Sequence, residues 1–175
     1  ARMLVFKSEG IEINYSEALR YAQMGVRKGN SYAMNLIAGL YKSGFGVAQN
    51  YEESNRYFRM AIEKGNEIAM YNYGICFKNG EGVEKNINQA INYFKMSINK
   101  GYVSAMIEYA NILNDGLDGI ECNKQEAIKY YKMAIDKGNG FAMYKYGAML
   151  YTGDGVQVDY KNALRYIKMG IKKDD

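Results

Sequence analysis

The chain lacks the residue types on which most enzyme active sites depend. Its 175 residues include no histidine, so no Ser-His-Asp or Cys-His arrangement can be built, and the commonest metal ligand is missing. The acidic residues recur where predicted helices begin or face solvent, and paired catalytic carboxylates are therefore not expected. We predict no catalytic residues, no metal site and no cofactor site, and hence no enzyme activity in this segment.

Three pairs of glycines of the form G-x-G are the next candidates for chemistry, because such loops can hold phosphates. They lie at Gly44/Gly46, Gly80/Gly82 and Gly153/Gly155. A dinucleotide or phosphate loop needs a preceding strand and either a third glycine or a following Lys-Ser/Thr. None of these features accompanies the pairs. We therefore interpret the glycines as positions of positive φ where the chain reverses between two helices.

The glycine pairs belong to a pattern that repeats along the sequence. Ala-Met occurs at residues 33–34, 69–70, 105–106 and 142–143, with spacings of 36, 36 and 37 residues. Lys-Gly, at residues 28–29, 64–65, 100–101 and 137–138, keeps the same spacings. A fixed period of this size is typical of a stacked array of structural repeats. An extra residue in the loop at 116–119 accounts for the one spacing of 37.

Each repeat is predicted to contain two helices with different residue patterns. The first carries small residues at two fixed positions, for example Ala33 and Ala38, which allow close packing of helices. The second begins with a capping residue and carries a stripe of small, tyrosine, methionine and aliphatic residues at helical spacing. The capping residues are Asn14, Asn50, Asn86, Asn123 and Asp159. We assign the methionines in register to the core, with a soft binding surface as the alternative.

The predicted helices span residues 15–28, 31–43, 51–64, 67–79, 87–100, 103–115, 124–137, 140–152 and 160–172. The copies share the pattern A-x-x-x-[LY]-[AG]-x-x-[YFL]-x-x-G-x-G-V-x-x-[ND]-x-x-x-A-x-x-Y-x-x-[MA]. This pattern resembles the Sel-one-like repeats, a branch of the tetratricopeptide-like α/α repeats. The resemblance implies an all-α, right-handed superhelical solenoid of about five helix-turn-helix repeats, with the first helices on its concave side. The sequence has tyrosine where the family often has tryptophan, and it has no proline after the glycine pairs.

We predict a single array over residues 1–175, as a segment of a longer protein. Its repeats are expected at about 1–28, which is partial, and at 29–64, 65–100, 101–137 and 138–175. Residues 3–6 are expected to be the tail of a first helix, and Gly10 to replace the second glycine of the loop.

Partner-binding residues are expected on the first helices, at positions that vary between copies. Mapping the tetratricopeptide groove onto them, as the resemblance implies, gives Tyr32, Asn35, Lys42, Ile68, Tyr71, Asn72, Lys78, Ile107, Asn111, Asn114, Phe141, Tyr144, Lys145 and Tyr151. Tyrosine offers a large contact area at small entropic loss, and asparagine can pair with an extended backbone. Tyr71, Ile107 and Tyr144 occupy equivalent positions and are expected to form a row. The alternative is that Tyr71, Tyr144 and Tyr151 only pack between repeats.

Composition narrows the classes of partner. The net charge of +4 is mild, and lysines gather in the last turns of the second helices, where the helix dipole accounts for them without a phosphate-binding face. No apolar run approaches the roughly 20 residues of a membrane span, and no signal peptide is visible. We therefore expect neither nucleic acid nor a membrane as a partner.

The two cysteines, Cys76 and Cys122, do not lie at matched positions. Some bacterial relatives join the two helices of every repeat by a disulfide at matched positions. The lack of that pattern favours a reducing compartment, and we predict a cytoplasmic protein.

These observations predict a non-catalytic scaffold or adaptor that binds a peptide or protein surface through its concave face. The alternative is a regulatory or targeting module of an enzyme, such as a kinase, whose catalytic domain lies outside this segment. The identity of the partner and the oligomeric state are left open.

Overall fold

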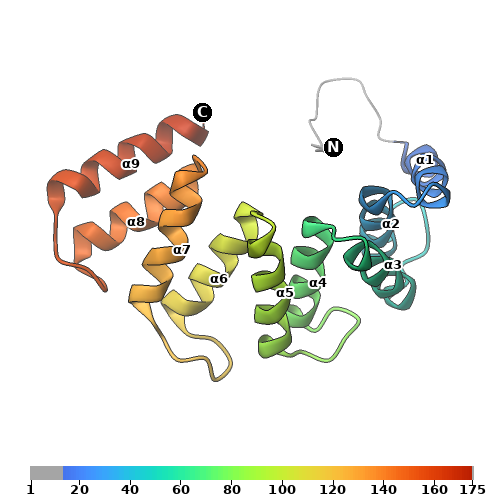
Figure 1. The fold of residues 1–175 in the computed structure, drawn as a ribbon, viewed down its shortest axis with the longest axis horizontal. Helices are drawn as coiled ribbons and strands as arrows, with labels where there is room; N and C mark the ends of the chain where they lie inside the picture. Colours follow the sequence, from blue (N-terminus) through green and yellow to red (C-terminus); the bar gives the residue numbers. More distant parts are fainter. Residues whose placement is uncertain (1–13, 175) are drawn as a thin grey trace. The chain divides into compact units, whose positions relative to one another are not determined.

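The structure is a computed structural model that describes residues 14–174, and these residues form nine α-helices (Figure 1). The helices are α1 (Tyr15–Arg27), α2 (Ser31–Ser43), α3 (Tyr51–Glu63), α4 (Glu67–Asn79), α5 (Ile87–Asn99), α6 (Val103–Asp115), α7 (Lys124–Asp136), α8 (Gly140–Thr152) and α9 (Tyr160–Asp174). Between residues 14 and 174 there is no strand, only an isolated bridge from Leu117 to Ile120. Residues 3–6 and Gly10, for which a helix end and a loop glycine were predicted, lie outside the described residues.

The helix boundaries agree closely with those predicted from the sequence. The first helices of the repeats, α2, α4, α6 and α8, begin and end at the predicted residues. The second helices α1, α3, α5 and α7 end one residue earlier than predicted. At three of them the terminal lysine (Lys28, Lys64 or Lys137) is the C-cap, and its N–H bonds to the carbonyl three residues back. The predicted all-α fold of two-helix repeats is confirmed.

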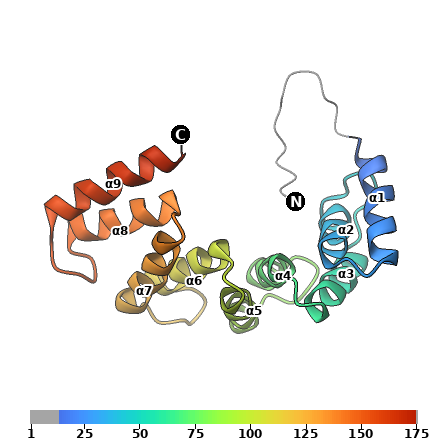
Figure 2. The same ribbon diagram turned by 45° about the horizontal axis from the view of Figure 1, so that its top comes forward.

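The described helices group into two compact units. The first extends to Asn86 and contains α1 to α4, with α2 packed against α1, α3 and α4. The second begins at Ile87 and contains α5 to α9, with α6 packed against α5 and α7, and α8 against α7 and α9. Figures 1 and 2 show α8 and α9 lying side by side. In both units a first helix packs against the second helices on either side of it.

Capping residues explain where most of these helices begin. Asn14, Asn50 and Asn123 accept a hydrogen bond from the backbone N–H three residues on, as predicted for second helices, and Asp159 does the same for α9. A second series of caps was missed by the sequence analysis. Asn30, Asn66 and Asn139 cap α2, α4 and α8 in the same way. In α6 this place belongs to Tyr102, whose side chain makes no capping bond.

The glycine pairs close the turn at the other end of each first helix. Gly44, Gly80 and Gly153 are the C-caps of α2, α4 and α8, with φ of 72°, 75° and 75°. This left-handed conformation favours glycine, so the interpretation of these residues as positive-φ turn positions is confirmed.

Small residues set how closely the two helices of a repeat approach. Ser54 on α3 is buried, and its Oγ donates a hydrogen bond of 2.8 Å to the carbonyl of Ala38 on α2. At Gly147 on α8, a Cβ would lie 2.8 Å from Cγ1 of Ile167 and 3.0 Å from the carbonyl oxygen of Ala163 on α9. The contact therefore leaves no room for even one methyl group on α8 at this point.

The core of the second helices lies beside the stripe predicted from the sequence. The methionines of the first helices are buried, as expected, but Met24, Met96 and Met169 of the second helices are exposed, so their assignment to the core is wrong. In α3, α5 and α7 the buried position is the one directly after the registered tyrosine, occupied by Phe58, Phe94 and Tyr131, which are 1%, 0% and 1% exposed. The tyrosine–methionine stripe follows an i, i+3 line, which drifts to the edge of the face that packs.

None of the helices within residues 14–174 is long or apolar enough to cross a membrane. Both cysteines are free thiols. Cys76 on α4 is fully buried, and burial raises the pKa of its thiol to about 11. Cys122, in the loop before α7, is exposed, and its Sγ lies 3.0 Å from the backbone oxygen of Asn114.

The close contact at Gly147 yields a stability prediction. Gly147→Ala should lower the free energy of unfolding by about 1–3 kcal/mol, because the added methyl group overpacks the α8–α9 contact. Gly39→Ala is the matched control, since a Cβ at this helical position meets nothing within 4 Å. It should raise the free energy of unfolding by about 0.5–1 kcal/mol. Urea denaturation measures both, and equal effects would contradict a tight contact at Gly147.

The two thiols should differ in reactivity. Iodoacetamide at about pH 8 should label Cys122 in the native protein and leave Cys76 unlabelled, because the thiolate is the reactive form. A pKa of about 11 lowers the thiolate fraction of Cys76 by more than about 100-fold relative to an ordinary thiol. Denaturant should therefore accelerate labelling of Cys76 by at least about 100-fold. Peptide mass spectrometry over time measures both rates, and rapid native labelling of Cys76 would show that α4 is not packed as described.

Candidate functional site

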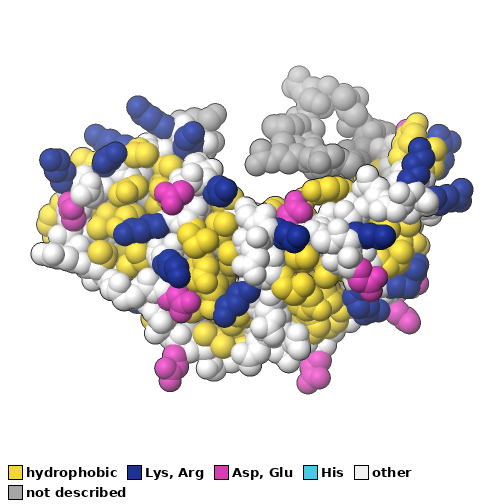
Figure 3. Space-filling view, in the orientation of Figure 1, with side chains coloured by type: hydrophobic (Ala, Val, Ile, Leu, Met, Phe, Trp, Pro, Cys, Tyr) yellow, Lys and Arg dark blue, Asp and Glu magenta, His cyan; other side chains and the backbone are white. Residues whose placement is uncertain are grey.

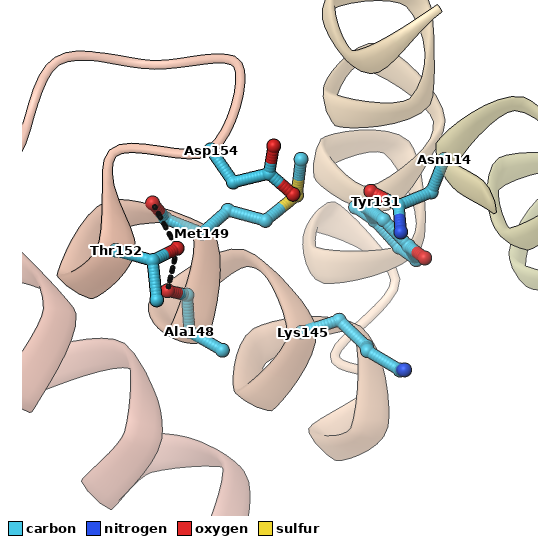
Figure 4. A pocket seen from close by; sticks show the side chains of 7 residues that line it. All are labelled: Asn114, Tyr131, Lys145, Ala148, Met149, Thr152 and Asp154. Atoms are coloured by element: carbon cyan, nitrogen blue, oxygen red, sulfur yellow. Dashed lines mark hydrogen bonds between the residues drawn. The ribbon is translucent and has the colours of Figure 1, made fainter. Parts of the chain in front are cut away.

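A slot in the second unit is a candidate site. Its volume is about 170 Å³, and it lies between the C-terminal end of α6, α7 and the outward face of α8 (Figure 4). The lining residues are Asn114, Tyr131, Lys145, Ala148, Met149, Thr152 and Asp154. Four of them come from α8 with i, i+3, i+4 and i+7 spacing, which places them on one face of that helix.

The floor of the slot is apolar except for one hydroxyl. Tyr131 and Met149 are both buried, and the hydroxyl of Tyr131 donates a 2.7 Å hydrogen bond to Oδ1 of Asn111 on α6. Burial raises the pKa of Tyr131 well above its usual range, and the negative charges of Asp115 and Glu108 add to this. The hydroxyl therefore stays protonated. The equivalent residues of α3 and α5 are phenylalanines, so the hydroxyl distinguishes α7 from them.

An ion pair borders one edge of the slot. Nζ of Lys124, the first residue of α7, lies 2.8 Å from Oδ2 of Asp154 and 3.4 Å from Oδ1 of Asn114. The bond to Asp154 raises the pKa of Lys124. The carboxylate of Asp154 is thus largely neutralised by a residue of the protein itself.

The opposite edge carries a cation without such a partner. Nζ of Lys145 lies 5.4 Å from the centre of the Phe141 ring, one helical turn earlier on α8. In the described part of the protein Lys145 is not paired with any carboxylate. The slot therefore combines an apolar floor, one neutralised ion pair and one unneutralised ammonium.

The equivalent positions of the first unit are arranged differently. Lys42 stands where Asn114 stands in the second unit, and its Nζ lies 3.0 Å from Oε2 of Glu81. Asn72 replaces Lys145, and its Nδ2 donates a 3.0 Å hydrogen bond to Oδ1 of Asn35. Ile75 replaces the smaller Ala148. At this place in the first unit, Lys42 and Asn72 are therefore both paired with polar side chains of the protein.

The structure brings together some of the partner-binding residues expected from the sequence. Asn114 and Lys145 line the slot, and Phe141 lies beside Lys145. Asn111 accepts the hydrogen bond from the Tyr131 hydroxyl on the floor of the slot. Tyr144 is exposed on α8 outside the slot. The remaining two candidates of the second unit are Ile107, which is half-buried, and Tyr151, whose ring lies 5.4 Å from that of Tyr160 on α9.

In the first unit the candidates are tied to neighbours or partly buried. The hydroxyl of Tyr32 donates a 3.2 Å hydrogen bond to Oε1 of Glu67, which raises the pKa of Tyr32. Asn35 pairs with Asn72, and Lys42 with Glu81. The half-buried candidates are Ile68, Tyr71 and Lys78. The row expected from Tyr71 to Ile107 and Tyr144 draws on both units, and it stays a prediction.

Sequence reasoning missed six residues of the site: Lys124, Tyr131, Ala148, Met149, Thr152 and Asp154. The rule that selects variable positions would have found Tyr131, because it differs from Phe58 and Phe94 in the same register. Tyr131 lies on a second helix, whereas the expected partner-binding positions lie on first helices. Among the described residues, no three His, Cys, Asp or Glu side chains gather as a metal ion would require.

Comparisons with known proteins agree on the architecture. The structure is similar to a Sel1 repeat protein from Oxalobacter formigenes, with 29% identity and a TM-score of 0.84 over 92% of this chain and 65% of that one. It is also similar to c5321, a protective antigen present in uropathogenic Escherichia coli strains that displays an SLR fold (21% identity, TM-score 0.63, 92% of this chain and 42% of that one). A third similar structure is the immunity protein Pa5087 from Pseudomonas aeruginosa (18% identity, TM-score 0.67, 95% of this chain and 61% of that one).

The chain spans less than two thirds of the length of each of these three proteins. No curated protein sequence matches it. The family model described as "Sel1 repeat" matches residues 1–30, 31–66, 68–102, 103–139 and 140–175. These five matches and the similarity of the fold confirm the predicted solenoid class, and the chain belongs to the Sel1 repeat family.

Proposed function

We propose that this protein is a non-catalytic scaffold that binds a protein or peptide through the outward surface of its first helices. Sel1 repeat proteins generally mediate protein–protein interactions and are typically not catalysts. In this proposal the five repeats act as one array over residues 1–175. The two free cysteines support a reducing compartment such as the cytoplasm.

The observation that carries the proposal is the slot on the first-helix side of the second unit, with exposed aromatic residues next to it. Phe141 and Tyr144 on α8 are 42% and 51% exposed. Large aromatic side chains beside a pocket are typical anchors of protein interfaces, because they bury much area at low entropic cost. Packing within the fold covers only part of each ring, so the exposed part is available to a partner.

The arrangement of charge supports a protein partner over a nucleic acid. Within each unit, on the face seen in Figure 3, the Lys and Arg side chains lie among apolar and acidic ones and form no continuous stripe. Nucleic-acid binding depends on neutralising many phosphates at once, which requires such a stripe or patch.

Partner capture with paired variants tests the proposal. The immobilised protein is used to isolate a partner, whose affinity is then measured for the wild type and for Phe141→Ala/Tyr144→Ala. Loss of two interface anchors should weaken binding by at least about 2 kcal/mol, or roughly 30-fold. Circular dichroism should show unchanged helicity, since both side chains are largely exposed.

The matched control is Tyr21→Ala/Met24→Ala on the second helix α1, where the two side chains are 56% and 48% exposed. It removes a similar apolar area and should change the affinity by less than about threefold. The opposite ranking of the two double variants would place the partner on the second helices and would refute the proposal.

A further inference from the structure

We propose that the slot beside α8 recognises a carboxylate of the partner, with the Lys145 ammonium as the binding group. The ligand class is a peptide segment that presents a carboxylate, either on an acidic residue or at the peptide's C-terminus, next to an apolar group. This inference rests on the proposed protein-binding function and deepens it.

The balance of charge within the slot carries the proposal. Lys124 and Asp154 neutralise each other at 2.8 Å, and Nδ2 of Asn114 donates to Oδ1 of Asp115. Among the described residues Lys145 has no carboxylate partner, and its Nζ lies over the ring of Phe141, which attracts the ammonium without cancelling its charge. The charge that faces a ligand at the Lys145 edge is therefore positive, whereas Asp115 and Glu108 place negative charge near the Tyr131 hydroxyl. Figure 4 shows Lys145 and Asp154 at opposite edges, so the pair at one edge leaves the cation at the other available.

The acidic residues near the floor decide where the carboxylate binds. Asp115 and Glu108 act on the Tyr131 hydroxyl, whose hydrogen is already donated to Asn111. A further negative charge is disfavoured there. We therefore assign the carboxylate to the Lys145 ammonium and not to the hydroxyl.

The rest of the slot suits the apolar part of such a ligand. Ala148, Met149 and the ring of Tyr131 offer carbon surface between the two polar edges. A residue as small as Ala148 leaves the centre open, whereas the first unit has Ile75 in this place. A methylene stem or an aliphatic group can lie here while the carboxylate reaches Lys145.

The first unit provides an internal comparison. Its site has Asn72 in place of Lys145, and its nearby cation, Lys42, is neutralised by Glu81 at 3.0 Å. It therefore has no unpaired ammonium at the equivalent position. Preference for a carboxylate is expected at the slot of the second unit and not at its counterpart.

The test uses the complete ¹⁵N-labelled protein and four small probes in two matched pairs. N-acetyl-leucine and its amide differ only in a terminal carboxylate, while N-acetyl-glutamic acid amide and N-acetyl-glutamine amide differ only in the carboxylate of the residue itself. The two acids should shift the backbone resonances of Lys145, Ala148 and Thr152 with dissociation constants on the order of millimolar. Each neutral probe should bind at least about fivefold more weakly. The stronger of the two acids identifies the source of the carboxylate.

Three variants separate charge from structure. Lys145→Gln should abolish the preference for acid over amide, and Lys145→Arg should retain it. Lys129→Gln removes an equal charge from the exposed face of α7 and should leave the preference unchanged.

Equal shifts by acid and amide, or a preference that survives Lys145→Gln, would overturn the inference. Inorganic phosphate serves as a fifth probe. If it shifts the same resonances more strongly than the acids, the slot is a general anion site and the peptide assignment fails. These outcomes do not depend on partner capture, so failure of the carboxylate assignment and failure of the scaffold function are distinguishable.

Discussion

The close approach of paired helices at small residues is the constraint on which the rest of the structure depends. Ser54 hydrogen-bonds directly to the backbone of α2, and Gly147 leaves no room for a methyl group against α9. Contacts this short hold the two helices of a repeat in a narrow range of positions, because neither backbone can move closer or turn without a clash. The aromatic residues one turn away, such as Phe58, then fill a space of defined shape.

A framework held in this way lets the outward positions change without disturbing the fold. The first and second units place different residues at equivalent sites, with Asn72 exchanged for Lys145 and Ile75 for Ala148. The first helices of both units are equally long, and α2, α4 and α8 are capped by an asparagine at one end and a glycine at the other. The exchanges at positions 72/145 and 75/148 thus change the surface chemistry through side chains, and this is how a repeat protein acquires a local site.

The exchange of ion pairs shows how such a site opens. In the first unit the cation is Lys42 on α2, and it pairs with Glu81 in the loop after α4. In the second unit the short Asn114 takes that position, and the loop aspartate pairs with Lys124 from the start of the second helix. The loop carboxylate is neutralised in both cases. Of the two arrangements, the one in the second unit leaves the space in front of α8 unfilled and Lys145 without an acidic partner among the described residues.

The sequence by itself determined the repeat, the helix boundaries to within a residue or two and the turn glycines, because these follow from local patterns that recur at a fixed spacing. It did not determine which face of the second helices is buried: the tyrosine–methionine stripe has helical spacing, but only packing shows that Phe58 and Tyr131 lie at the centre of the buried face. Two of the seven residues that line the slot were among those predicted from the sequence. Asn114 and Lys145 stand at variable first-helix positions, whereas Lys124 and Asp154 come from different elements and meet only when α7 and α8 pack together. The tertiary structure alone brings Lys124 and Asp154 together, because no local sequence pattern predicts an ion pair between residues this far apart in the chain.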